Sequence, residues 1–127
     1  MKKLILIFVA LSLFVGLPVM AMDGNVLLKS CEDGIKMLEN DTSADEFNAG
    51  TCKGFILGSL QVHSLYTDIY KQKPYYCLPE NPPVGQLVRI TVKYLKSNPE
   101  FLHYGAAVSV HNAMIQAFPC SQKRPSK

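Results

Sequence analysis

Residues 50–58, which read Gly-Thr-Cys-Lys-Gly-Phe-Ile-Leu-Gly, contain three glycines spaced four residues apart. On a helix such glycines form a ridge without side chains. Each glycine costs about 1 kcal/mol relative to alanine inside a helix, so three of them need a compensating gain. We therefore expect the backbone of another helix of the same chain to pack on this ridge, with a helix–helix dimer face as the alternative. Lys53, Gln61 and Asp68 make the segment too polar to lie in lipid.

The N-terminus has the layout of a secretory signal peptide. Lys2 and Lys3 precede an apolar run over residues 4–19, and Val-Met-Ala at residues 19–21 is an acceptable cleavage site. The run is shorter than the roughly 20 apolar residues that span a bilayer, which disfavours a retained membrane anchor. We predict a signal peptide over residues 1–21 and a mature protein outside the cytoplasm. In a bacterium this is the periplasm, with no membrane association after cleavage.

Apolar residues at helical spacing begin soon after the cleavage site and predict two consecutive helices. The first begins at Asn25, taken as the N-cap, and ends before residues 40–42. The second is the glycine-containing helix, which fades around Tyr70. It begins with Ser-Ala-Asp-Glu at residues 43–46, a capping box in which Ser43 is the N-cap. Because the turn between the two helices is short, we expect them to run antiparallel side by side.

Two further helices complete the predicted fold. The third begins near Val84. The fourth begins at Pro99, with Asn98 as its N-cap, and stops at Pro119. The mature chain is long enough for one small domain with one modest core. We therefore predict an all-α fold, a small four-helix bundle over residues 22–120. A polar, basic and disordered tail is expected over residues 121–127.

The four cysteines, Cys31, Cys52, Cys77 and Cys120, are expected to form two disulfides in an oxidising compartment. Cys31 and Cys52 each lie about 14 Å along a helix from the first turn, and are therefore level with each other. In an up-down arrangement Cys77 and Cys120 fall near the same end of the bundle. We therefore favour the pairs Cys31–Cys52 and Cys77–Cys120. A zinc site is the competing interpretation, but the ligand spacing is absent.

The connection over residues 71–83 contains four prolines and is expected to be stiff and irregular. A loop that is also held by a disulfide at Cys77 loses less entropy on binding than a flexible one. Tyr75 and Tyr76 supply aromatic area of the kind enriched at interface hot spots. The alternative is that these two tyrosines cover the end of the core. We predict that a partner protein contacts Tyr75, Tyr76, Leu78, Glu80 and Asn81.

The sequence shows no convincing set of catalytic, cofactor-binding or metal-ligating residues. His63, His103 and His111 are spread over two predicted helices and form no ligand cluster. The acidic pairs at residues 32–33 and 45–46 are adjacent, so their side chains diverge by about 100° on a helix. Loss of the signal peptide leaves 11 basic and 10 acidic residues, which argues against nucleic acid as a partner. We therefore expect a binding protein, and neither an enzyme nor a protein that needs a cofactor or metal.

Six segments occur together in a characteristic order: residues 52–58, 76–79, 85–88, 93–95, 98–103 and 113–120. The most specific are Cys-Leu-Pro at residues 77–79 and the terminal Phe-Pro-Cys at residues 118–120. In this order they resemble the Rap/Tai family of type VI secretion immunity proteins, over about two thirds of the mature chain.

The resemblance implies a periplasmic helical protein that protects its producer from a peptidoglycan-cleaving cysteine amidase delivered by the type VI system. Family members are often dimers and block the amidase cleft by inserting surface elements, so inhibition would be steric. The motif residues look structural, so the predicted contact residues rest on the stiff loop. A general periplasmic chaperone-like stress protein is the alternative function, and an enzyme is the weakest one.

Overall fold

The computed structural model describes residues 21–120. The predicted tail, and the predicted signal peptide except for its last residue, lie outside the described residues. The elements are α2 (Gly24–Leu38), α3 (Glu46–Ser64), the short segment η1 (Leu65–Ile69), α4 (Val84–Ser97), the short segment η2 (Pro99–Phe101) and α5 (Ala106–Ala117). Within residues 21–120 there is no strand beyond an isolated bridge between Asp23 and Gly105. The predicted all-α fold with four main helices is confirmed. The predicted start of the fourth helix at Pro99 is wrong, because only the short segment η2 forms there and α5 begins at Ala106.

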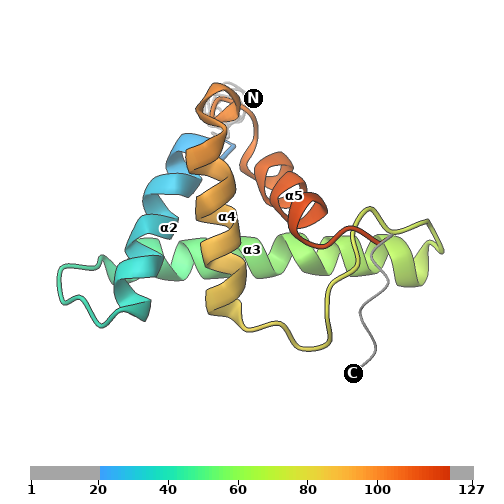
Figure 1. The fold of residues 1–127 in the computed structure, drawn as a ribbon, viewed down its shortest axis with the longest axis horizontal. Helices are drawn as coiled ribbons and strands as arrows, with labels where there is room; N and C mark the ends of the chain where they lie inside the picture. Colours follow the sequence, from blue (N-terminus) through green and yellow to red (C-terminus); the bar gives the residue numbers. More distant parts are fainter. Residues whose placement is uncertain (1–20, 121–127) are drawn as a thin grey trace, which may run out of the picture.

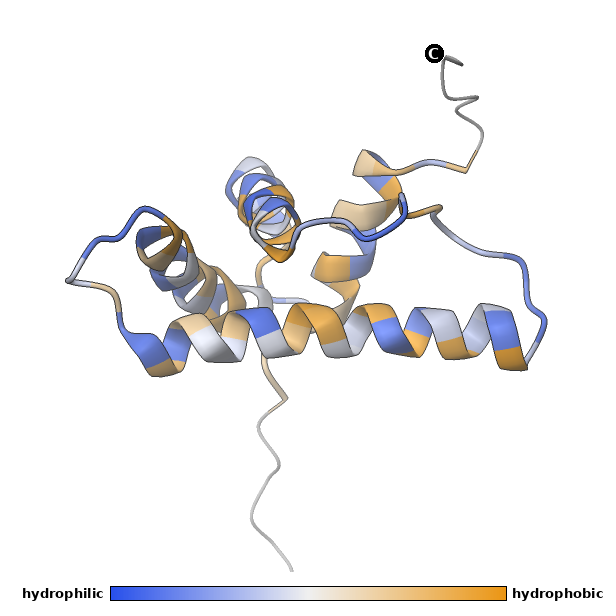
Figure 2. Ribbon diagram, turned by 90° about the horizontal axis from the view of Figure 1, so that it is seen from below, coloured by the Kyte–Doolittle hydropathy of each residue, from blue (hydrophilic) through white to orange (hydrophobic). Residues whose placement is uncertain are grey.

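The long helix α3 is the base on which the other three main helices pack. Helices α2, α4 and α5 stand across it (Figure 1), and the perpendicular view places all three on the same side of α3 (Figure 2). No helix of the described residues covers the opposite side. The short turn had predicted that the first two helices run antiparallel side by side. This prediction is wrong, because α2 crosses α3. This arrangement gives α3 one buried side and one open side.

Helix α2 begins two residues earlier than predicted. The side chain of Asp23 is the N-cap, and its Oδ1 atom accepts a hydrogen bond from the Val26 N–H at 3.0 Å. Asn25, the predicted cap, lies inside the helix and donates through Nδ2 to the carbonyl oxygen of Leu102 at 3.2 Å. A tertiary contact therefore occupies the side chain that local sequence had assigned to capping.

Helix α3 begins later than predicted, and the predicted capping box at residues 43–46 does not form. Asp45 is the N-cap and accepts a hydrogen bond from the Asn48 N–H at 2.8 Å. Ser43 lies outside the helix, where its own N–H donates to Asp41 Oδ1 at 2.8 Å. The two carboxylates, which are stronger acceptors than a serine hydroxyl, therefore decide the geometry of this turn.

The core lies between α3 and the three helices that cross it. Its most buried members are Leu27, Cys31, Cys52, Ile56, Leu87, Val88, Leu95, Val110 and Met114. The Cys31–Cys52 disulfide is inside this core and joins α2 to α3, with the Cα atoms 4.9 Å apart. The Cys77–Cys120 disulfide joins the loop after η1 to the chain just beyond α5, with the Cα atoms 4.8 Å apart. Both predicted disulfides are confirmed.

A polar contact around Asp33 adds to the junction of α2 and α3. The Asp33 carboxylate accepts a hydrogen bond from Asn48 Nδ2 at 2.9 Å and pairs with Lys36 Nζ at 3.1 Å. These hydrogen bonds, the one from Asn48 first, hold the pKa of Asp33 below its usual value. Because the pKa is lowered in the folded state, the contribution to stability is complete above the ordinary pKa and is lost as the pH falls.

The glycine ridge of α3 does not meet another helix of this chain. A Cβ atom on Gly50, Gly54 or Gly58 would find no neighbouring atom within 4 Å. The close backbone approach occurs at Gly24 instead, where a Cβ atom would lie 2.8 Å from the carbonyl oxygen of Leu102. The prediction that the ridge packs within the chain is therefore wrong. The reason is that α2, α4 and α5 all pack on another side of α3.

Alanine substitutions at Gly24 and Gly50 are expected to shift stability in opposite directions. Gly24→Ala forces a methyl group against the Leu102 backbone and should lower the free energy of unfolding by about 1–3 kcal/mol. In the monomer Gly50→Ala meets open space and should raise it by up to about 1 kcal/mol through helix propensity. Chemical denaturation of the mature, oxidised protein measures both changes. A loss of stability in Gly50→Ala would show that the ridge is packed in solution.

Candidate functional site

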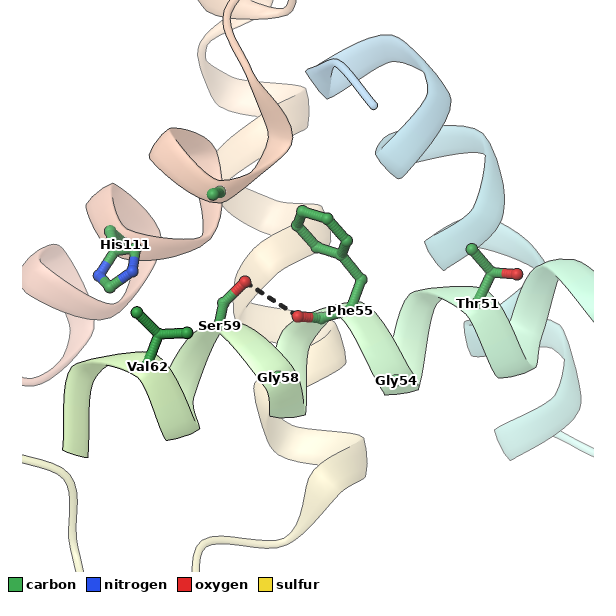
Figure 3. A pocket seen from close by; sticks show the side chains of 8 residues that line it. Thr51, Gly54, Phe55, Gly58, Ser59, Val62 and His111 are labelled. Carbon is green, nitrogen blue, oxygen red and sulfur yellow. Dashed lines mark hydrogen bonds between the residues drawn. The ribbon is translucent and has the colours of Figure 1, made fainter. Parts of the chain in front are cut away.

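An apolar groove that is open to solvent lies between α3 and α5. It has a volume of about 710 Å³ and is lined by Thr51, Gly54, Phe55, Gly58, Ser59, Val62, Ala107 and His111. The close view shows Phe55, Ser59 and Val62 extending from α3 toward α5, with His111 reaching from α5 toward them (Figure 3). We call this feature the α3/α5 groove. Gly54 and Gly58, two of the three glycines of the ridge, are part of its α3 wall.

The polar residues of the α3/α5 groove use their hydroxyl groups within α3. Ser59 Oγ donates to the carbonyl oxygen of Phe55 at 2.9 Å, a bond drawn in Figure 3. Thr51 Oγ1 donates in the same way to the carbonyl oxygen of Phe47 at 2.8 Å. Each bond returns to the preceding turn of the helix, so neither hydroxyl hydrogen is directed at a ligand. The groove is therefore more apolar than its residue types suggest.

A second hollow of about 350 Å³ continues the α3/α5 groove, because Ala107 and His111 line both. Its other lining residues are Tyr75, Val108, Asn112 and Ile115. Large apolar side chains that line the two hollows are exposed, and among them Val62 is 62% exposed and Val108 49% exposed. Exposed apolar surface that extends over several elements is typical of a protein-binding site. The two hollows together form one candidate binding face.

Aromatic rings gather at one end of this face. Tyr66 on η1 and Tyr75 on the loop stack with ring centroids 5.4 Å apart, and their hydroxyl oxygens are 3.3 Å apart. Tyr76 stacks on His63 with centroids 3.8 Å apart, and His111 lies 5.7 Å from Tyr76. The loop is thereby fixed to α3 and α5 through ring contacts. We call these five residues the aromatic cluster.

The buried members of the aromatic cluster are neutral at pH 7. Burial lowers the pKa of His63, and burial together with the neighbouring His63 lowers the pKa of His111. Burial also raises the pKa of the Tyr76 phenol to about 12. The Tyr76 hydroxyl has no hydrogen-bond partner among the described residues. An uncharged cluster beside an apolar groove suits an apolar or aromatic partner surface better than a charged ligand.

The two adjacent tyrosines predicted to contact a partner have different positions. Tyr75 is 60% exposed and lines the binding face. Tyr76 is only 1% exposed, because its ring is covered by the core and by His63. The prediction that Tyr76 offers contact surface is therefore wrong, and the alternative that it covers the end of the core applies to it. Opposite orientations of adjacent residues in an irregular loop are not encoded in a local pattern.

The remaining predicted contact residues lie elsewhere. Leu78 is half-buried and packs against the core, while Glu80 and Asn81 are exposed on the way to α4. None of the three lines the α3/α5 groove or its continuation. The structure thus brings Tyr75 alone of the predicted set onto the binding face. The other two exposed residues stay predicted contacts of the loop.

Sequence reasoning missed the apolar residues that line the open face, Val62, Val108 and Ile115. The helical spacing of Val62 is the same as that of a buried position, so spacing alone does not mark this residue as exposed. A signal was available, since α3 carries apolar residues on more than one side, as the repeated orange positions of Figure 2 show. A helix with apolar residues on more than one side buries only part of them against a single layer of helices.

The described residues contain no metal site, free cysteine or membrane-spanning helix. No three histidine, cysteine or acidic side chains of residues 21–120 come together as a metal site. The four cysteines, all within this range, are paired in the two disulfides. None of the helices described there is both long and apolar enough to cross a membrane.

Comparison with known proteins identifies one family. The family model of the Rap1a immunity proteins matches residues 23–120, which include all the described helices. Searches of curated proteins and of solved structures found no match.

Proposed function

Because the chain belongs to the family of Rap1a immunity proteins, we propose that it binds and sterically blocks a peptidoglycan-cleaving cysteine amidase secreted by a type VI system. Immunity proteins act by binding an effector. The resemblance noted in the sequence favours an amidase as that effector. Protection of the producing cell then follows if the bound protein excludes the cell-wall peptide from the amidase cleft.

The observation that supports this proposal best is the exposed Tyr75 beside the apolar α3/α5 groove. The loop that carries Tyr75 is fixed on both sides of the tyrosine. The Tyr75 N–H donates to His63 Nε2 at 3.3 Å, and the Cys77 N–H donates to the Phe118 carbonyl oxygen at 2.8 Å. A rigid aromatic residue next to a hollow binds with a small entropy cost. Such a projection suits insertion into an enzyme cleft.

The proposed location is the periplasm. Two disulfides are typical of proteins that fold in an oxidising compartment. The proposed amidase cleaves peptidoglycan, which lies in the periplasm, so a protein that protects against it must be present in the periplasm. The signal peptide predicted for residues 1–21 would supply the export route.

We also propose that a second copy of the chain packs on the glycine side of α3, as the dimer alternative for these glycines had suggested. The ridge is open at Gly50, Gly54 and Gly58, and Leu57 beside it is exposed. Because Gly54 and Gly58 also line the α3/α5 groove, the second copy would pack at the edge of the candidate binding face. Close approach of two helices at glycines would offset their unfavourable helix propensity. Sedimentation of the mature protein over a range of concentrations tests this, and a monomer at all concentrations would contradict it.

The proposed function is tested with the mature, oxidised protein and the amidase encoded beside its gene. Calorimetry should show nanomolar binding in a one-to-one or two-to-two complex, and the same ratio should abolish peptidoglycan hydrolysis. Binding without inhibition would contradict the steric mechanism. If the protein instead binds unfolded proteins of many kinds and ignores the amidase, the chaperone-like alternative would replace the immunity function. The exposed apolar face is the feature that such an alternative would use.

A further inference from the structure

His63, near the end of α3, holds two consecutive residues of the loop. Its Nε2 atom accepts a hydrogen bond from the Tyr75 N–H at 3.3 Å. Its ring stacks on the Tyr76 ring, with centroids 3.8 Å apart and planes inclined by 15°. The residue itself is only 8% exposed. One imidazole therefore fixes both the backbone of the exposed tyrosine and the ring of the buried one.

The hydrogen bond to Tyr75 requires a neutral imidazole. A ring nitrogen accepts a hydrogen bond only while it carries no proton, so the hydrogen of neutral His63 is on Nδ1. Protonation of Nε2 would replace the acceptor with a second donor, which would face the Tyr75 N–H. The hydrogen bond would then be lost, and the two N–H groups would repel each other. Loss of this bond leaves the Tyr75 backbone without its contact to α3.

The groups around His63 come from three parts of the fold. From α5, His111 has its ring centroid 6.2 Å from that of His63, so a charge on either imidazole opposes a charge on the other. From η1, Asp68 favours the protonated form of His63. The phenols of Tyr75 and Tyr76 also lie beside His63, and Tyr66 stacks on Tyr75. Burial outweighs Asp68, and the pKa of His63 is lowered.

We propose that His63 is a positioning residue that presents Tyr75 to the partner, and that protonation of His63 releases this segment and weakens partner binding. The inference rests on the proposed function, because it takes Tyr75 as a contact to the amidase. Beyond the proposed function, this inference gives His63 a role in binding although His63 need not touch the amidase itself. It also adds a dependence on pH that an aromatic contact alone would not have.

The direction of the pH dependence follows from the lowered pKa. The unfolded chain takes up a proton on His63 near the ordinary value of 6.5, while the folded protein does so only at lower pH. Between the two values the unfolded state binds more protons, so stability falls as the pH falls. The loss of stability therefore begins near pH 6.5, whereas the contact itself is lost only when the pH falls through the lower pKa of folded His63.

The free protein provides the first test. In a titration of the mature, oxidised protein by nuclear magnetic resonance, the Tyr75 amide should shift at the same pH as the His63 ring signals. Hydrogen exchange at this amide should accelerate over the same range, while amides of α4 stay protected. A Tyr75 amide that stays protected after His63 is protonated would overturn the inference. So would a His63 that takes up its proton only when the whole protein unfolds.

Binding to the amidase provides the second test, with variants that separate positioning from packing. At a pH low enough for the resonance titration to show His63 protonated in the folded protein, the wild-type protein should bind about tenfold more weakly than at pH 7.5, the scale of one lost hydrogen bond. His63→Gln keeps a carbonyl acceptor that does not titrate, and should bind at pH 7.5 but lose this pH dependence. His63→Leu fills the space without an acceptor and should bind weakly at both pH values. Equal pH dependence in wild type and His63→Gln would overturn the inference.

The exposed His103 is the matched control. It lies outside both hollows, so His103→Gln should keep the wild-type pH dependence. The two tests also separate this inference from the proposed function. If the Tyr75 amide follows His63 but no amidase binds at any pH, the proposed function fails while the positioning role stands. If the amidase binds with no contribution from His63, the positioning role fails and the function stands.

Discussion

Tyr75→Ala is expected to weaken binding to the amidase by about 100-fold or more, the loss typical of a central aromatic hot spot. Tyr75 is the large side chain that is both exposed on the loop and in contact with the groove. Its ring is held by stacking on Tyr66, so little conformational freedom is lost when a partner covers it. The fold should survive, because the 60% exposed ring contributes little to the core.

Calorimetry at pH 7.5, with thermal unfolding as the check on the fold, measures this effect. Tyr104→Ala is the matched control, because Tyr104 is also exposed, at 46%, and lines neither hollow. Tyr75→Phe should retain most of the affinity, since the ring and its stacking on Tyr66 remain. A folded Tyr75→Ala variant with unchanged affinity would remove this tyrosine from the interface.

Removal of the two disulfides is expected to have different consequences. Cys31→Ala with Cys52→Ala opens a bridge inside the core and should cost about 3 kcal/mol in chain entropy, with a further loss from the vacated space. For a domain of this size the midpoint of thermal unfolding should fall by about 20 °C or more. Cys77→Ser with Cys120→Ser removes an exposed bridge, so no core cavity is left.

The exposed bridge should matter more for binding than for the core. Loop length alone would rank Cys77–Cys120 as the more stabilising bridge, because it spans 43 residues against 21 for Cys31–Cys52. The buried position of Cys31–Cys52 instead predicts that this bridge contributes more to the free energy of unfolding, and we expect burial to outweigh loop length. The Cys77→Ser/Cys120→Ser variant should therefore keep a cooperative unfolding transition but bind the amidase more weakly, since the Tyr75 loop is less ordered. A larger fall in the unfolding midpoint for this variant would contradict the ranking.

The disulfides and the helices were predictable because both depend on information that is local or geometric. Apolar spacing located the four helices. Cys31 and Cys52 lie at similar distances from the short turn, and they still meet although α2 crosses α3. The helix caps were less predictable, since Asp23 and Asp45 competed with other residues that are equally good caps by type. In each case a neighbouring contact decided which side chain was free to cap.

The position of the glycine ridge could not be read from the sequence. Three glycines on one side of a helix indicate that something approaches closely, but not whether it belongs to the same chain. Packing of α2, α4 and α5 on another side of α3 decided that the ridge stays open. The same packing formed the α3/α5 groove, because residues of α3 and α5 that are distant in sequence face each other only after folding.

The sequence by itself determined the four helices and the resemblance to the immunity family, because helical spacing and motif order are properties of the linear chain. It favoured the pairing of the cysteines, which the structure then established. Only the tertiary structure decided that Tyr75 is exposed while Tyr76 is buried against His63. It alone also decided which side of α3 remains open. Both outcomes depend on which helices compete for the same apolar surface, and that competition is settled only when the whole core packs.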